Sequence, residues 1–132
     1  MKKKILLTCL VALMSTTSAY SYTGNCDGGT IVAGFCKSNV ALNWWSAQAW
    51  CQANGSRLAT MYEMCPSWDG NEGSGKCPEL YSKGEGNAWS ATAKGGGSAF
   101  LIRLSDGEVF SNSRFVSCTG YSCDNNYYAF CR

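Results

Sequence analysis

Few residues of this 132-residue chain can do chemistry of the kind that enzymes use. Histidine, the most frequent general base in enzymes, is absent. All eight cysteines beyond residue 21 are expected to be oxidised, which removes the thiolate nucleophile. A carboxylate pair, Asp106 and Glu108, lies in a turn between two strand patterns, where solvated charge is the ordinary interpretation. We therefore expect a protein that is not an enzyme.

Metal ligands are also scarce. Without histidine or a Cys-x-x-Cys pair, zinc ligation has almost no support. The stretch from Asp69 to Gly75 starts like a calcium-binding EF-hand loop, but position twelve, which requires glutamate, is Leu80. We interpret this stretch as a polar loop and expect neither a metal nor a cofactor.

The first 21 residues have the pattern of a signal peptide. Three lysines follow Met1, an apolar run extends from Ile5 to Met14, and small uncharged residues occupy 15–21. The apolar run is shorter than the roughly 20 residues needed to span a bilayer. We expect residues 1–21 to be removed on export and residues 22–132 to form a single domain without a membrane span. Its location would be secreted, periplasmic or at the cell surface.

Removal of the signal peptide changes the charge and the cysteine count. The formal net charge of +2 becomes −1, because eight basic residues remain beside nine acidic ones. Without a basic run, nucleic acid is not an expected partner. Eight cysteines remain of nine, and in a short exported chain they indicate a disulfide framework. Spacing alone leaves 105 possible pairings open.

Two helices are predicted in the first half of this domain. Residues 43–53 have helical spacing at Trp44, Ala47 and Cys51, with Asn43 as a cap and Gly55 beyond the end. A capping box, Thr-x-x-Glu at residues 60–63, predicts a shorter helix to about residue 65.

Strands are predicted in the second half. They cover 88–92, 99–104, 108–111, 114–118 and 127–131, and Asp106-Gly107 predicts a hairpin turn. Early helices and late strands indicate an α+β domain. Glycine-rich or polar loops are expected at 69–76, 83–87 and 94–98.

The order of these residues resembles a C-type-lectin-like domain. Trp45-x-Ala47-x-x-x-Cys51, then Gly55, Leu58-Ala59 and Glu63 are similar to its first half, and Cys123 to Cys131 resembles its end. Cys26 to Cys36 resembles the N-terminal hairpin of long-form members. Compact bacterial members, such as those of collagen-like adhesins, are the nearer match, through Trp89-Ser90-Ala91-Thr92, 99–104, Asp106-Gly107 and Phe130-Cys131-Arg132.

This resemblance implies a C-type-lectin-like fold in which two helices pack on a small twisted antiparallel sheet. It also implies four disulfides, namely Cys26–Cys36, Cys51–Cys131, Cys65–Cys77 and Cys118–Cys123. The family's calcium-binding triplets (Glu-Pro-Asn or Gln-Pro-Asp) and its Trp-Asn-Asp motif are missing here. A short Asp-Gly hairpin stands where the long calcium loop would be. Calcium-dependent sugar binding is therefore not implied.

Candidate binding residues come from two considerations. Core packing is expected for at least two of Trp45, Trp50 and Trp89, whereas exposure is expected for Trp44 and Trp68, where an aromatic ring could stack on a sugar or anchor a protein. In the family, ligands meet the loops at the strand ends opposite the termini. The remaining candidates lie in these loops and are Lys94, Asn112, Arg114, Tyr121, Asp124, Asn125 and Asn126.

The expected function is that of an adhesin-like binding module that recognises a glycan or a surface protein without calcium. Strong affinity for a polyanion is not expected at a net charge of −1, unless the basic side chains at 94, 103, 114 and 132 cluster. The alternative is a structural or assembly subunit of a bacterial surface or envelope complex. An exposed apolar patch containing Trp44 or Trp68 would favour assembly, and a polar, basic concavity near Arg114 would favour ligand binding.

Overall fold

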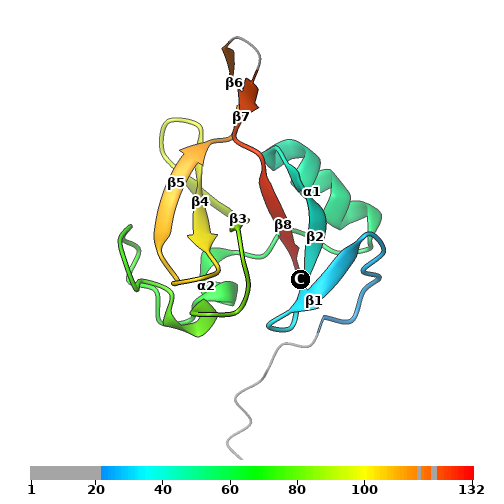
Figure 1. Ribbon diagram of the computed structural model, residues 1–132, viewed down its shortest axis with the longest axis horizontal. Coiled ribbons are helices and arrows are strands. Elements are labelled where there is room, and N and C mark those ends of the chain that lie inside the picture. The colour runs from blue at the N-terminus through cyan, green and yellow to red at the C-terminus, as the bar shows by residue number, and fades with distance from the viewer. Residues whose placement is uncertain (1–21, 116, 120–121) are drawn as a thin grey trace, which may run out of the picture.

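The computed structural model describes residues 22–115, 117–119 and 122–132, with the backbone alone described at 117–119 and 122–124. The predicted signal peptide lies outside these residues. The elements in chain order are β1 (Gly29–Val32), β2 (Phe35–Leu42), α1 (Trp44–Ala53), α2 (Met61–Met64), the 3-10 helix η1 (Pro78–Leu80), β3 (Asn87–Lys94), β4 (Ser98–Arg103), β5 (Val109–Ser113), β6 (Ser117–Thr119), β7 (Ser122–Asp124) and β8 (Tyr127–Cys131). Figure 1 shows their arrangement. The prediction of an α+β domain is confirmed.

Helix α1 begins and ends as its sequence predicts. The side chain of Asn43 accepts a hydrogen bond from the Ser46 amide at 2.8 Å, which satisfies one of the free amides of the first turn. After the cap residue Asn54, the backbone at Gly55 has φ +76°, a conformation in which glycine carries no steric penalty.

Helix α2 is a single turn held by the predicted capping box. The Thr60 hydroxyl accepts from the Glu63 amide at 3.2 Å, and the Glu63 carboxylate accepts from the Thr60 amide at 2.9 Å. The turn buries Met61 and Met64 in the core.

The main sheet has six strands in the order β1-β2-β8-β3-β4-β5. The expectation of a wholly antiparallel sheet was wrong, because β3 runs parallel to β8 and pairs with it at Ala88 and Tyr128 alone. Beyond that point the two strands diverge, and the link between the helices fills the space. The Ala59 amide donates to Phe130 of β8 at 2.8 Å, and the Ala59 carbonyl accepts from Ala91 of β3 at 2.8 Å.

The predicted strand over residues 114–118 does not join this sheet. Strand β5 ends at Ser113, which is paired with Ser98 at the beginning of β4. The next amide, of Arg114, has no strand partner and donates to Gly97 in the β3–β4 turn at 2.9 Å. Strand β6 instead pairs with β7 in a separate hairpin, which projects from the top of the molecule in Figure 1.

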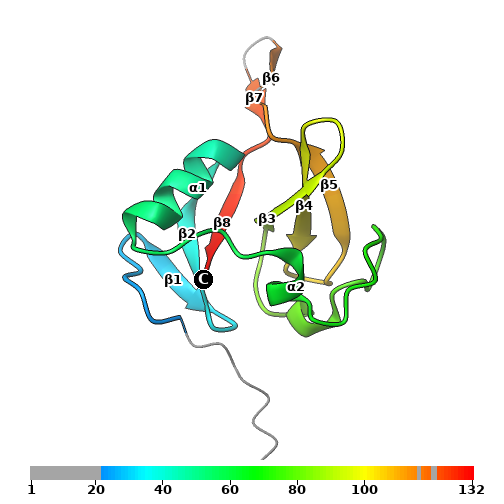
Figure 2. The ribbon, with the colours of Figure 1, turned by 180° about the vertical axis from the view of Figure 1, so that it is seen from behind.

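Both faces of the sheet are covered. Along β4, Phe100 and Ile102 belong to a core with α2, whereas Ala99 and Leu101 belong to a core with α1. This alternation follows from the two-residue period of a strand. Figure 2, the view from behind, shows α1 over the half of the sheet that contains β2 and β8, with α2 below β4 and β5.

Three of the four expected disulfides are present, namely Cys26–Cys36, Cys51–Cys131 and Cys65–Cys77. The first closes the N-terminal β1–β2 hairpin, the second joins α1 to β8, and the third closes the polar loop after α2. Cys118 and Cys123 are register partners in the β6–β7 hairpin. Their side chains lie outside the described part of the chain, so the fourth disulfide stays a prediction.

Candidate functional site

Two adjacent tryptophans begin helix α1, and the structure buries the first and exposes the second. Trp44 is only 7% exposed and its indole donates to the Ser90 carbonyl at 2.9 Å, whereas Trp45 is 53% exposed. The expectation of an exposed Trp44 was wrong because Trp44 lies on the same helix face as Ala47 and Cys51, which is the buried face. The two rings meet edge to face, with centroids 4.8 Å apart.

Trp68 is also buried, contrary to the expectation of exposure. Its ring packs edge-on against Phe100 of β4 at 4.8 Å, and its indole donates to the Asn71 carbonyl at 2.8 Å. The polar loop beside it therefore supplies a backbone acceptor for a core side chain. Of the tryptophans expected in the core, Trp89 is fully buried and Trp50 packs against the core while partly buried.

Arg114 is placed on the two indoles of α1. Its guanidinium carbon lies 5.1 Å from the ring centroid of Trp44 and 5.9 Å from that of Trp45. Stacking of this kind is attractive because the ring face is electron-rich. The Nε group also donates to the Gly97 carbonyl at 3.3 Å, so ring contact and hydrogen bond fix the guanidinium together.

Gly97 makes room for the next residue, Phe115. The backbone of Gly97 has φ +78°, and a Cβ added there would lie 2.5 Å from the Phe115 ring. The Phe115 side chain is 59% exposed. The β3–β4 turn therefore supports two consecutive residues after β5, one cationic and one aromatic.

Polar groups adjoin these two residues. The amide of Asn112 donates to the Tyr127 hydroxyl at 2.7 Å, and the amide of Asn125 donates to the Phe115 carbonyl at 3.5 Å. Asn126 is exposed beside them. We refer to the residues named in these contacts, at and after the end of β5, as the Arg114 surface, which consists of Trp45, Gly97, Asn112, Arg114, Phe115, Asn125 and Tyr127.

Lys94 lies apart from this surface. Its ammonium group contacts Glu72 at 2.6 Å and Ser111 at 3.3 Å, and it lies over the Phe100 ring. Phe100 belongs to the core on the α2 side, whereas Asn112 contacts Tyr127 on the α1 side. The two faces of the sheet thus separate Lys94 and Trp68 from the other candidates.

Of the predicted candidates, Arg114 lies over the buried Trp44, Asn125 contacts Phe115 beside Arg114, and Asn112, in β5, contacts Tyr127. Tyr121 lies outside the described residues, as does the side chain of Asp124. Sequence reasoning missed Trp45 and Phe115. The helical spacing at 44, 47 and 51 could have placed Trp45 off the buried face, whereas nothing in the sequence indicated the contact between Phe115 and Gly97.

Charge pairing distinguishes Arg114 from the other arginines. Arg57 and Arg132 both bind Glu63, at 2.6 and 2.5 Å. Arg103 binds Asp106 and Glu108 together, so this carboxylate pair is held by a cation in its turn. Among residues with described side chains, no acid pairs with Arg114, and no acceptor binds its Nη groups. The four basic side chains whose clustering would have favoured a polyanion are therefore dispersed.

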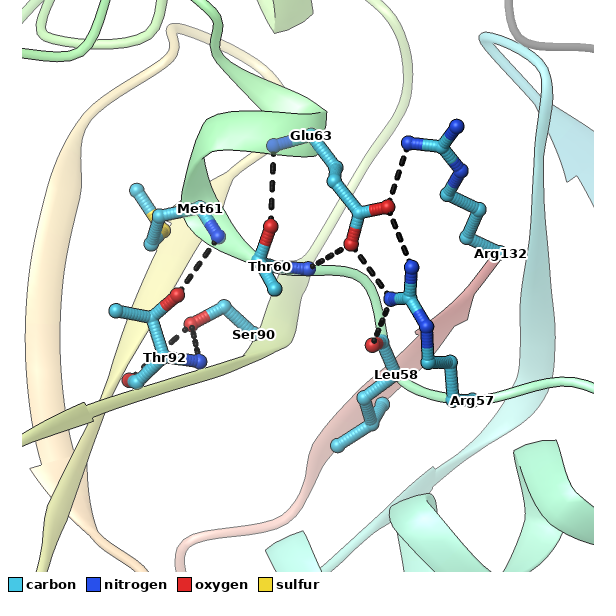
Figure 3. Close-up of polar contacts among 8 residues, drawn as sticks. All are labelled: Arg57, Leu58, Thr60, Met61, Glu63, Ser90, Thr92 and Arg132. Atoms are coloured by element: carbon cyan, nitrogen blue, oxygen red, sulfur yellow. Dashed lines mark hydrogen bonds and ion pairs between the residues drawn. The ribbon is translucent and has the colours of Figure 1, made fainter.

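A second charged cluster, centred on Glu63, is structural (Figure 3). Both carboxylate oxygens bind Arg57, and one of them also binds Arg132 at the end of β8. The hydrogen bond from Arg57, with those from Thr60, lowers the pKa of Glu63 to about 2. The cluster ties α2 to the link before it and to the last strand, and both arginines are already paired with the carboxylate.

The acidic groups of the polar loop are also neutralised by cations. Lys76 lies 2.7 Å from Asp69 and its hydrogen bond lowers the pKa of Asp69 to about 2. Lys94 similarly lowers the pKa of Glu72. The one cluster of metal-ligand types among the described residues is Cys65, Cys77 and Glu79. Its two sulfurs are joined in a disulfide and offer no thiolate.

Comparison with known proteins adds no relative. No family model, no curated protein and no solved structure matches the chain. Within the described residues, no helix is both long and apolar enough to cross a membrane. The class that fold and surface define is therefore a disulfide-bonded α+β domain with an aromatic and cationic surface at one end.

Proposed function

We propose that this protein is an exported, adhesin-like binding module that recognises a glycan at the Arg114 surface without calcium. The observation that carries the proposal is the placement of Arg114 over the two indoles of α1 without an acidic partner among the described side chains. A fixed cation beside an exposed indole and several side-chain amides offers both stacking and directed hydrogen bonds. Those are the contacts a sugar ring requires.

The same proposal includes a C-type-lectin-like fold for this domain. The Cys51–Cys131 bond between the first helix and the last strand supports it, as does the hairpin closed by Cys26–Cys36. Both pairings are the ones that the family resemblance implies. Export is supported by the disulfides themselves, which persist in oxidising compartments.

Independence from calcium is supported by the state of the acidic groups. The polar loop that starts like a calcium loop has Asp69 and Glu72 in ion pairs with lysines. At the twelfth position, Leu80 is fully buried and supplies no oxygen from its side chain. On the Arg114 surface the described polar side chains are amides, a hydroxyl and a guanidinium, which bind sugars without a metal.

The alternative function, a structural or assembly subunit, lacks the observation that we expected to favour it. That expectation was an exposed apolar patch containing Trp44 or Trp68, and both side chains are buried. Two of the exposed aromatic rings among the described residues, Trp45 and Phe115, instead border a cation and polar amides.

A glycan array tests the proposal. The purified oxidised protein is applied with and without chelator, beside the variants Arg114→Ala and Lys83→Ala. Lys83 is exposed and makes no ion pair with any described residue, so Lys83→Ala removes one positive charge elsewhere. We expect binding that survives the chelator, persists in Lys83→Ala and is lost in Arg114→Ala. Loss on chelation would contradict the calcium-free site, and absence of any glycan signal would contradict glycan recognition.

A further inference from the structure

The Nη groups of Arg114 have no acceptor among the described residues. Its Nε already donates to the Gly97 carbonyl at 3.3 Å, and its guanidinium carbon lies 5.1 Å from the ring centroid of Trp44 and 5.9 Å from that of Trp45. What remains are the two Nη groups, whose parallel N–H bonds match the two oxygens of a carboxylate. Because stacking and hydrogen bond hold the group in place, little side-chain freedom is lost when an anion binds.

No described side chain competes for these Nη groups. The carboxylates of Glu63, Asp106 and Glu108 are each bound by another arginine, and those of Asp69 and Glu72 by lysines. A carboxylate on the ligand would give this guanidinium the strong, charge-assisted pair that no described side chain supplies.

An apolar platform adjoins the anion position. The Trp45 side chain is 53% exposed, and its ring centroid lies 5.9 Å from the guanidinium carbon. The cation and the half-exposed indole are therefore adjacent, as a single ligand that contacts both would require. Phe115, across Gly97, adds a second exposed ring for a neighbouring unit.

The surroundings disfavour an extended polyanion and a protein partner. Arg57, Arg103 and Arg132 are bound in ion pairs elsewhere. Of the four arginines, a long polyanion would therefore meet Arg114 alone without an ion pair to a described residue. Of the exposed large apolar side chains described, Trp45 and Phe115 are the two that the described contacts join to Arg114. A specific protein interface commonly buries about 800 Å² per partner around an apolar centre. Two exposed rings beside one cation make a small apolar centre for an interface of that size.

We propose that the ligand is an acidic saccharide, whose single carboxylate binds the Nη groups of Arg114 while its ring stacks on Trp45. This inference rests on the proposed function and names the chemistry of the sugar. It predicts affinity for terminal uronic or sialic acid residues and a weak dependence on salt, as expected when one charge pair forms.

The test compares three matched probes in titrations with the intact oxidised protein. They are an oligosaccharide with a terminal uronic acid, its methyl ester, and the neutral parent sugar. We expect the acid to bind at least tenfold more tightly than the ester or the parent. Arg114→Lys and Trp45→Ala should each weaken binding of the acid at least tenfold, because lysine keeps the charge and loses the paired donors. Lys83→Ala should leave it unchanged.

Different failures of this test have different meanings. If the neutral parent and the ester bind as tightly as the acid, and Trp45→Ala still abolishes binding, the acidic ligand is contradicted while the glycan module stands. If an acidic peptide binds as tightly as the acid sugar, the choice of a saccharide is overturned. If no sugar of the array or of this series binds, the proposed function itself fails. Circular dichroism and non-reducing gels verify that each variant is folded and oxidised.

Discussion

The side chain of Arg114 lies over the indole of Trp44, with 5.1 Å between the guanidinium carbon and the ring centroid. This contact joins the end of β5 to the first turn of α1, two segments that are distant in sequence. Trp44 is buried and its indole is hydrogen-bonded to the Ser90 carbonyl of β3. Its ring is therefore held in place beneath the guanidinium. We therefore expect Trp44 to contribute to stability and Trp45 to the proposed binding.

Replacement of each tryptophan by alanine should separate these roles. Trp44→Ala removes a buried ring and its hydrogen bond, and should lower the free energy of unfolding by about 3–5 kcal/mol. Trp45→Ala removes a half-exposed ring and should cost less than about 1 kcal/mol. Urea denaturation of the oxidised proteins measures both. Equal losses, or the larger loss at Trp45, would contradict the burial described here.

Glu63 should make the free energy of unfolding depend on pH in the acidic range. Its pKa in the folded protein is about 2, against an ordinary value of 4.5. The corresponding stabilisation is fully present above pH 4.5 and is lost as the pH falls toward 2. Glu63→Gln should therefore lower the free energy of unfolding at pH 7 by about 2–3 kcal/mol. Urea titrations at a series of pH values measure this difference.

The matched control for Glu63 is Glu85→Gln, because Glu85 is exposed and its carboxylate interacts with the nearby cation Lys37 only by a secondary electrostatic contact. We expect this control to change stability by less than about 0.5 kcal/mol. A wild-type minus Glu63→Gln difference that stays constant from pH 7 to pH 2.5 would show that the charge of Glu63 is not the source of the effect.

The Asp-Gly turn before β5 requires its glycine. Gly107 has φ +68°, and a Cβ there would lie 2.2 Å from the carbonyl oxygen of Cys77. Both atoms belong to backbone, so relief requires movement of the disulfide-closed loop. Gly107→Ala should lower the free energy of unfolding by more than about 2 kcal/mol. Gly95→Ala, in the open β3–β4 turn with nothing within 4 Å, should be nearly neutral. Similar denaturation midpoints for the two variants would contradict this assignment.

The disulfide between α1 and β8 should be worth more than the one in the N-terminal hairpin. Cys51 and Cys131 are separated by 80 residues, whereas Cys26 and Cys36 are separated by 10. In the chain-entropy model these loops correspond to about 4.5 and about 3 kcal/mol. We expect the double alanine variant of the long-range pair to unfold at the lower urea concentration. Peptide mapping without reduction checks the pairing, and a different partner for Cys51 would contradict the fold.

Much of the fold could be predicted because its signals are local. Asn43, Gly55 and the Thr60–Glu63 capping box set the helix ends through contacts within a few residues, and Asp106-Gly107 sets the hairpin. The parallel pairing of β3 with β8 could not be predicted in this way. It is accompanied by hydrogen bonds from the link at Ala59 to both strands, and these contacts join three segments that are distant in sequence.

The candidate site was predicted in part. Arg114, Asn112 and Asn125 follow from the placement of loops at strand ends. Trp45 and Phe115 do not follow from it. The exposure of Trp45 depends on the orientation of α1, and the position of the Phe115 ring depends on the φ of Gly97. Lys94 was grouped with Arg114 because both flank the same strand ends. Its neighbour across the sheet, Ser111, faces the opposite side from Asn112, and so does Lys94.

The central claim, that Arg114 is the anchor of a calcium-free glycan site, is tested most directly by one array measurement. Wild-type protein, Arg114→Ala and Lys83→Ala are applied side by side in chelator. We predict the same bound glycans for wild type and Lys83→Ala, and signals at least tenfold lower for Arg114→Ala. Equal signals from Arg114→Ala and wild type, or a wild-type signal that appears only when calcium is added, would contradict the claim.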